Sequence, residues 1–500
     1  MKHYSSIPLV ARAMQFSKKM AIISKQGSFT YSELDEISQR VASGLLNGEK
    51  DLSGARVAFL TVRGFEYVAA QWGIWRAGGI AVPLCEVYPF PELEYVVRDC
   101  GATIVISDQV NKERIQPITE KLDLRFALIQ ELIDHSKCMC PEILPERAAM
   151  IIYTSGTTSK PKGVVITHKN IESQIKSLVQ AWEWNSSDYI LSVLPLHHVH
   201  GIINVISCAL WAGALCEITS RFDALEVWDR FIEKDYTLFM AVPTIYSKLI
   251  NVWENSPRSK RNAMTKACTS FRLMVSGSAA LPATVFKKWE EISGHILLER
   301  YGMTEAGMIL SNPLHGERIP GTVGFPLPGV EVRLMDERGI VMADGKEGEI
   351  QVKGPGVFLE YWNRPDETRK AWKNGWFSTG DIAVREKGRY RILGRKSIDI
   401  IKTGGYKVSA LEIEEVYRSH YQIKDCAVVG VQDDEWGERI CIGIIPKNSE
   451  VLSLDEIRAW GKKRLAPYKV PTKMLVMEDL PRNLMGKVNK KRLAELFLLQ

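Results

Sequence analysis

The stretch Tyr153-Thr-Ser-Gly-Thr-Thr-Ser-Lys-Pro-Lys-Gly163 directly follows an apolar run over residues 148–152. The apolar run predicts a buried strand, and the residues after it predict a loop that closes over phosphate groups. Glycine lets backbone N–H groups approach an anion, hydroxyls donate to phosphate oxygens, and lysine neutralises charge. The Gly-x-x-x-x-Gly-Lys spacing of a Walker loop is absent, so this strand and loop indicate another kind of nucleotide-binding α/β fold.

Strand-like and helix-like segments alternate around this loop. Strands are expected near residues 56–62, 79–84, 101–107 and 271–276, and helices near 31–45 and 66–75. This alternation predicts an α/β fold on a largely parallel sheet. From about residue 321, short strands between Gly/Pro turns predict a β-rich subdomain. The apolar stretch 201–215 is too short to span a bilayer and predicts a buried helix.

The length of 500 residues exceeds what one hydrophobic core usually supports. We expect a large multi-layer N-terminal domain at 1–394, a hinge at 395–398 and a small mobile α+β domain at 399–500. The net charge of +6, from 65 basic and 59 acidic residues, is slight and suits anionic small molecules rather than nucleic acid. Nine scattered cysteines without a Cys-x-x-Cys pair, and a start without a signal or presequence pattern, predict a cytoplasmic protein.

Five further segments fit a nucleotide site. Three histidines stand in the segment 194–201, and residues 301–305 join an aromatic, a glycine, a hydroxyl and a carboxylate suited to Mg²⁺. Residues 378–381 end in an aspartate that could hold ribose hydroxyls. The remaining two segments, 394–406 and 481–487, open and close the last hundred residues.

In this order, the six motifs resemble the adenylate-forming enzymes, which include acyl-CoA synthetases, carrier-protein adenylation domains and firefly-type luciferases. The resemblance covers essentially the whole chain and implies a two-step reaction. A carboxylate attacks the α-phosphate of Mg·ATP to give an acyl-adenylate and pyrophosphate, and the thiol of coenzyme A then displaces AMP. Charge neutralisation and alignment of several anions are the catalysis that such a reaction needs.

The resemblance also assigns roles residue by residue. It makes Lys487, Thr304, Glu305 and His198 catalytic, with Glu305 as the Mg²⁺ ligand. It places the following residues at ATP or AMP: Thr154, Ser155, Gly156, Thr157, Thr158, Lys162, Gly277, Ser278, Ala279, Glu299, Arg300, Tyr301, Gly302, Met303, Asp381 and Arg395. It places Gly404, Gly405 and Tyr406 at coenzyme A, after a rotation of the small domain that withdraws Lys487. The family's hinge residue is usually Asp or Lys where this chain has Ser397, so Ser397 and Ile398 both remain candidates for the pivot.

The acid is the harder question. Arg300 directly precedes Tyr301, and an arginine at the acyl pocket can bind a second carboxylate. Several segments, 298–305 and 404–412 among them, are similar to those of malonyl-CoA synthetases, which implies malonate or methylmalonate as the substrate. The acyl pocket is then expected to include His198, His200, Ser278 and Arg300. The alternative is that Arg300 pairs with Glu299 or with the ATP phosphates.

Three other functions remain in competition. The first is a ligase for a medium-chain or aromatic monocarboxylate, and the second is an adenylation enzyme that loads a carrier-protein thiol. The third is a nucleotide-binding regulator without catalysis, which the presence of both Lys487 and Glu305 disfavours. A metal at His197, His198 and His200 is not expected, because their spacing lacks the i, i+4 geometry of helical zinc motifs. The sequence leaves a monomer and a homodimer equally possible.

Overall fold

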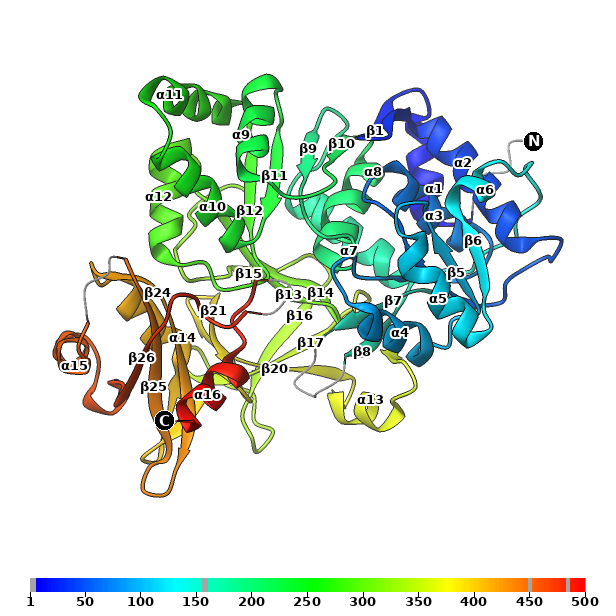
Figure 1. The fold of residues 1–500 in the computed structure, drawn as a ribbon. Helices are drawn as coiled ribbons and strands as arrows, with labels where there is room; N and C mark the ends of the chain where they lie inside the picture. The colour runs from blue at the N-terminus through cyan, green and yellow to red at the C-terminus, as the bar shows by residue number, and fades with distance from the viewer. Residues whose placement is uncertain (1–5, 155–160, 448–451, 483–485, 500) are drawn as a thin grey trace.

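The computed structural model describes residues 6–154, 161–447, 452–482 and 486–499. Two large sheets lie side by side in the first two thirds of the chain, and a smaller sheet lies below them (Figure 1). The orange and red C-terminal part forms a separate lobe beside the smaller sheet. The α/β fold class with a β-rich subdomain and a small C-terminal unit is therefore confirmed.

A nine-stranded sheet carries one side of the large domain. Its strand order is β15 (Phe325–Pro326), β14 (Gly307–Ser311), β13 (Leu298–Met303), β12 (Leu273–Ser276), β11 (Leu238–Ala241), β9 (Tyr189–Ser192), β10 (Leu215–Ile218), β1 (Met20–Ser24) and β2 (Gly27–Thr30). The six strands from β13 to β1 are parallel, and antiparallel strands close both edges. Their carboxyl ends therefore meet along one border of the sheet, where ligands bind in open α/β sheets.

A seven-stranded sheet carries the other side. Its order is β18 (Glu360–Tyr361), β8 (Lys162–Thr167), β7 (Ala148–Thr154), β4 (Ile80–Pro83), β3 (Arg56–Leu60), β5 (Ile104–Ser107) and β6 (Arg125–Leu128). The strands from β7 to β6 are parallel, and β8 turns back antiparallel to β7 with Thr154 opposite Lys162. The predicted buried strand before the phosphate loop is thus β7.

The β-rich subdomain and the small domain each have a five-stranded sheet. The first comprises β16 (Glu331–Met335), β17 (Glu347–Lys353), β19 (Trp372–Lys373), β20 (Trp376–Glu386) and β21 (Arg389–Arg395). The second comprises β22 (Ile400–Thr403), β23 (Tyr406–Ser409), β24 (Ile423–Asp433), β25 (Gly437–Pro446) and β26 (Lys473–Val476). Residues 396–399 connect the two sheets. The boundaries 394 and 398 stay a prediction.

Helices pack on these sheets. In the large domain they are α1 (Pro8–Ala13), η1 (Met14–Phe16), α2 (Tyr31–Leu46), α3 (Phe65–Arg76), α4 (Phe90–Asp99), α5 (Lys112–Leu122), α6 (Ile129–Ile133), α7 (His168–Ala181), η2 (His200–Ser207), α8 (Cys208–Ala212), α9 (Ala224–Glu233), α10 (Pro243–Glu254), α11 (Arg258–Ala267), η3 (Cys268–Ser270), α12 (Ala283–Ser293) and α13 (Pro365–Ala371). In the small domain they are α14 (Ala410–Arg418), α15 (Leu454–Lys462), η4 (Pro467–Lys469) and α16 (Lys490–Leu498). No helix within the described ranges has the length and apolarity needed to cross a membrane.

Two features of local structure bear on the sequence predictions. A capping box of Thr30 and Glu33 begins α2, the helix that the sequence predicts near residues 31–45. The apolar stretch 201–215 is buried, but its first part is the π-helix η2, which passes into α8. π-Helices are rare and frequently occur at functional sites. This one begins at His200, one of the predicted pocket residues.

One large core unites the two sheets of the large domain, with a second cluster on the outer face of the seven-stranded sheet. The small domain has apolar clusters of its own on the two faces of its sheet. A separate core allows the small domain to move as a unit, because domains with their own cores behave as semi-independent bodies. The cavity described below lies between the two sheets of the large domain and the β-rich subdomain.

Candidate active site

The end of β7 and the start of β8 bring two predicted phosphate ligands together. Thr154 and Lys162 are paired across the two strands and both line a cavity of about 540 Å³. The Lys162 ammonium forms an ion pair with Glu367 of α13 and lies 5.3 Å from the centre of the Tyr361 ring. Four other predicted phosphate ligands, Ser155, Gly156, Thr157 and Thr158, lie outside the described residues.

The predicted base and ribose ligands form one hydrogen-bonded network. The Tyr301 hydroxyl donates to Asp381 Oδ2 at 2.5 Å, and Arg395 Nε donates to Asp381 Oδ1 at 3.1 Å. Arg395 also donates to the Thr379 carbonyl at 2.9 Å. Burial raises the pKa of Asp381, while the nearby Arg395 opposes that rise. The network connects β13, the middle of β20 and the end of β21.

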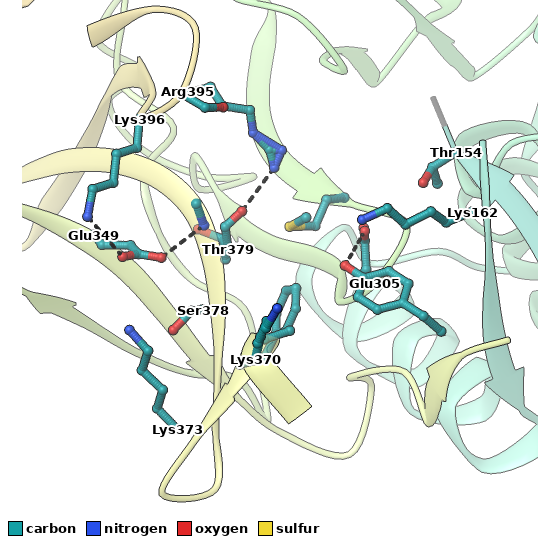
Figure 2. Close-up of a pocket in the computed structure, with 16 residues that line it drawn as sticks. Thr154, Lys162, Glu305, Glu349, Lys370, Lys373, Ser378, Thr379, Arg395 and Lys396 are labelled. Atoms are coloured by element: carbon teal, nitrogen blue, oxygen red, sulfur yellow. Dashed lines mark hydrogen bonds and ion pairs between the residues drawn. The ribbon is translucent and has the colours of Figure 1, made fainter. Parts of the chain in front are cut away.

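Glu305 lines the cavity that Thr154 and Lys162 also line, and lies beside Lys162 (Figure 2). Its Oε1 accepts a hydrogen bond from the Tyr361 hydroxyl at 2.9 Å, and burial raises the pKa of the carboxyl. A buried carboxylate beside hydroxyls and a phosphate loop is a suitable ligand for a hard cation. Met303 lines the cavity as well, and Thr304 stands between it and Glu305. Gly302 packs so closely that an added Cβ would lie 2.3 Å from the Gly307 carbonyl oxygen.

Arg300 points away from this cavity into a buried site of its own. Its guanidinium covers Gly277, where an added Cβ would lie 2.6 Å from Arg300 Nε. Ser278 adopts a left-handed backbone conformation, with φ of +71°, directly after that glycine. Such strain in a residue other than glycine is uncommon and clusters at functional sites. Here it places the Ser278 hydroxyl 3.3 Å from Arg300 Nη2 and 3.3 Å from His200 Nδ1.

Burial determines the charges in this second site. It lowers the pKa of Arg300 to about 9 and the pKa of His200 well below the usual range. His200 is therefore neutral near pH 7. Because the Ser278 hydroxyl accepts from Arg300, its proton can go to His200 Nδ1, and we assign the imidazole proton to Nε2. Within the described part of the chain, no acidic side chain forms an ion pair with Arg300.

Lys487 connects the two sites. Its pKa is lowered, chiefly by removal of the ammonium from water and then by the positive charges of Arg300 and Arg395. The residue as a whole remains exposed at the surface, so the lost hydration concerns the ammonium end. Burial lowers the pKa of His198 to about 4, with Lys487 as the next cause. Lys487, Arg300 and His198 therefore act on one another electrostatically, and the small domain is docked with Lys487 facing the large domain.

The buried site around Arg300 contains nitrogens that have no hydrogen-bond partner in the part of the chain that the structure describes. Among the described residues, Arg300 Nε, His198 Nε2 and His200 Nε2 all lack a partner. Buried polar groups are nearly always paired, so unpaired ones together indicate that a ligand or water completes them. Because one of these three nitrogens belongs to a cationic side chain, an anion is the ligand that would suit them best.

Some predicted residues lie elsewhere. Glu299 does not line the cavity; its Oε1 accepts from the Leu281 N–H at 3.2 Å. Ala279 is exposed after the Ser278 turn. Gly404 and Gly405 form the turn between β22 and β23, Tyr406 is the first residue of β23, and none of the three lines the cavity. Tyr406 instead stacks on Tyr468, with ring centres 4.1 Å apart.

The cavity also contains residues that sequence reasoning missed. They are Glu349, Tyr361, Lys370, Ala371, Lys373, Phe377, Ser378, Thr379, Gly380, Lys396 and Ser397. Ser378 to Gly380 belong to the motif that ends in Asp381, so that motif could have indicated them. Tyr361 and Lys370 carried no signal, because only the tertiary fold brings β18 and α13 to the cavity that Thr154 and Lys162 line.

A two-part α/β fold with a half-buried lysine at the start of β8, a buried carboxylate paired with an arginine and a separate small domain is the arrangement expected of an adenylate-forming enzyme. The family model "AMP-binding enzyme" matches residues 9–362, and "AMP-binding enzyme C-terminal domain" matches residues 412–487. The chain therefore belongs to the AMP-binding enzyme family, and it is an AMP-forming acid–CoA ligase.

The comparisons name more particular relatives. A mitochondrial malonate–CoA ligase of Mus musculus is 44% identical over 98% of this chain and 90% of its own length. A malonate–CoA ligase of Arabidopsis thaliana is 40% identical over 95% of this chain and 86% of its own length. The crystal structure of ATP-bound MatB from Rhodopseudomonas palustris has a TM-score of 0.91 and is 32% identical, over 99% of both chains.

Proposed function

We propose that this protein is an ATP-dependent malonate–CoA ligase. The observation that carries the proposal is Arg300, a buried cation without an acidic partner among the described residues, within electrostatic reach of Lys487. A buried charge is costly unless an opposite charge accompanies it. A short dicarboxylate supplies one carboxylate to each cation. The names of the similar malonate–CoA ligases support the same substrate.

The residues on the page divide the first half-reaction between them. Arg300, held by Gly277 and Ser278, binds the distal carboxylate and so aligns the reacting one with Lys487. Lys487 neutralises the charge between that carboxylate and the α-phosphate. Asp381 and Arg395 hold the ribose beside the Tyr301 ring. One carboxylate oxygen bonds to the α-phosphorus, the bond to the β-phosphate oxygen breaks, and its electron pair leaves with pyrophosphate.

Neutral histidines suit this arrangement. Because burial lowers the pKa of His198 to about 4 and holds that of His200 well below its usual value, both histidines are uncharged near neutral pH. Each can then offer an N–H to the substrate carboxylate without adding a third and fourth cation to a buried site. This role rests on geometry, since both Nε2 atoms lack another partner in the described chain.

Mg²⁺ fits the site through Glu305. The buried carboxylate, the neighbouring Thr154 hydroxyl and ATP's own phosphate oxygens form the hard oxygen donor set that Mg²⁺ prefers. When bound, the ion would neutralise phosphate charge. For the second half-reaction, the small domain would rotate at 395–398, remove Lys487 and bring Gly404, Gly405 and Tyr406 to coenzyme A.

The test is pyrophosphate release with Mg·ATP and coenzyme A for malonate, methylmalonate, succinate, acetate, octanoate and cinnamate. In the wild type we expect selective turnover of malonate or methylmalonate. Arg300→Met preserves volume but removes the charge, and should lower kcat/KM for malonate by roughly 100-fold or more. Ala would in addition leave a cavity, so Arg300→Ala is the second variant.

Acetate is the matched control substrate, because it lacks the second carboxylate. Its kcat/KM should be the same in Arg300→Met as in the wild type. If octanoate or cinnamate were turned over equally well by the wild type and Arg300→Met, the ligase chemistry would stand but the assignment of a dicarboxylate substrate would be rejected. Turnover only with an added carrier-protein thiol would reject coenzyme A as the acceptor.

A further inference from the structure

The cavity between β7, β13 and β20 is lined by five cationic side chains and two carboxylates. The cations are Lys162, Lys370, Lys373, Arg395 and Lys396, and the carboxylates are Glu305 and Glu349. Lys370 and Lys373 have no role in the reaction as derived above. Both belong to one segment, residues 365–373, which comprises α13 and β19 and which we call the α13 arm.

Charge pairing separates these two lysines from the other three cations. Lys162 pairs with Glu367, Arg395 with Asp381 at 3.1 Å, and Lys396 lies 3.9 Å from Glu349. Neither Lys370 nor Lys373 forms an ion pair with any residue that the structure describes. Two uncompensated cations on the wall of a cavity raise the local concentration of anions there.

Three contacts hold the α13 arm in place. Glu367 forms an ion pair with Lys162, Thr368 Oγ1 accepts the Tyr361 N–H at 3.0 Å, and Trp372 of β19 pairs with Phe377 of β20. Figure 2 shows Lys370 and Lys373 on the opposite side of the drawn residues from Arg395, with Lys373 near Ser378. The two lysines therefore belong to a segment that is anchored to β18, to β20 and to Lys162 at the start of β8.

We propose that Lys370 and Lys373 bind the outer phosphates of ATP and the pyrophosphate that leaves. The proposal rests on the adenylating function above, but not on which acid is used. As the bond from the α-phosphorus to the bridging oxygen breaks, its electron pair moves onto pyrophosphate, whose negative charge grows. Lys370 and Lys373 stabilise that charge, and Lys162 forms its ion pair with Glu367 again once pyrophosphate has left.

A diphosphate could also come from coenzyme A, which carries the same chemistry. The structure favours ATP, because Thr154 and Lys162 line the cavity together with Lys370 and Lys373. Gly404, Gly405 and Tyr406, the residues assigned to coenzyme A, do not line it. The two sources give different results in the following experiment.

The experiment is isothermal titration of the full-length protein with pyrophosphate alone, followed by ATP–pyrophosphate exchange. The double variant Lys370→Ala/Lys373→Ala should raise the Kd of pyrophosphate and its KM in exchange by roughly tenfold, the usual worth of a lost charge-assisted hydrogen bond. The charge-retaining pair Lys370→Arg/Lys373→Arg should restore most of the loss. The KM of coenzyme A in the second half-reaction should not change.

Arg369→Ala is the matched control, since Arg369 lies on α13, pairs with Asp366 at 3.1 Å and does not line the cavity. If Arg369→Ala weakened pyrophosphate binding as much as the double variant does, the effect would come from general surface charge, and the proposal would be overturned. An unchanged pyrophosphate Kd, or a raised KM for coenzyme A alone, would also overturn it. Because the titration contains no acid, failure of the malonate assignment leaves its result intact.

Discussion

Glu299 and Arg300 are consecutive on β13, and their side chains reach opposite faces of the sheet because side chains alternate along a strand. This excludes the ion pair between them that the sequence left as an alternative for Arg300. Arg300 meets Ser278 and His200, whereas Glu299 meets the Leu281 N–H. Burial raises the pKa of Glu299 to about 8, so the carboxyl is protonated in the folded protein at neutral pH.

The raised pKa of Glu299 predicts how stability changes with pH. Between about pH 4.5 and 8 the unfolded chain loses this proton and the folded chain keeps it, so the carboxyl lowers stability progressively. Glu299→Gln should therefore match the wild type near pH 4.5 and exceed it above, by at most about 1.4 kcal/mol per pH unit up to about pH 8. Denaturant unfolding across this range measures the difference. Glu290→Gln, at an exposed position on α12, is the control, and a pH-independent difference for Glu299→Gln would contradict the prediction.

The small domain contacts the large domain at the N-terminus of α12. Glu415 of α14 accepts the Ala283 N–H at 3.1 Å, across the domain boundary. The first N–H groups of a helix lack intrahelical partners and carry partial positive charge, so a carboxylate there is stabilising. The docked arrangement that presents Lys487 thus depends in part on one helix terminus.

Removal of this contact should disfavour the docked arrangement. Glu415→Ala should slow the first half-reaction by roughly two- to fivefold, in line with the worth of a charge at a helix N-terminus. Rapid-quench measurement of pyrophosphate release gives the rate. Glu412→Ala on the same helix breaks a pair with Lys469 inside the small domain and should leave the rate unchanged. If both variants behaved alike, the α12 contact would have no special part in docking.

At the scale of the whole molecule, the small domain is docked against the large domain in the arrangement that we expect for adenylation. Lys487 acts electrostatically on Arg300, Arg395 and His198, while Tyr406 stacks on Tyr468 outside the cavity. Neither Lys487 nor the predicted coenzyme A turn lines the cavity, but the charge of Lys487 acts on Arg300 and Arg395. We expect a rotation of the small domain to exchange the two between the half-reactions.

Lys487→Ala should separate those half-reactions. Adenylation should fall by roughly 100- to 1000-fold, because the charge that Lys487 neutralises develops in the first transition state. ATP binding, measured by titration, should change little, and thioester formation from supplied acyl-adenylate should persist. Near-normal pyrophosphate release in Lys487→Ala would show that another group performs the neutralisation.

The sequence by itself determined the family, the α/β class and the chemistry of the nucleotide site, because each motif combines a backbone requirement with a reactive side chain over a few residues. Thr154, Lys162, Glu305 and Asp381 were predicted in this way, and the first three line the cavity. The tertiary structure alone decided the partners of Arg300, the position of Glu299 and the presence of the α13 arm in the cavity. Those depend on contacts between segments up to hundreds of residues apart and on which face of a strand meets them. Local patterns carry no record of such contacts, because burial and opposing charge arise only when the sheets and the small domain pack together.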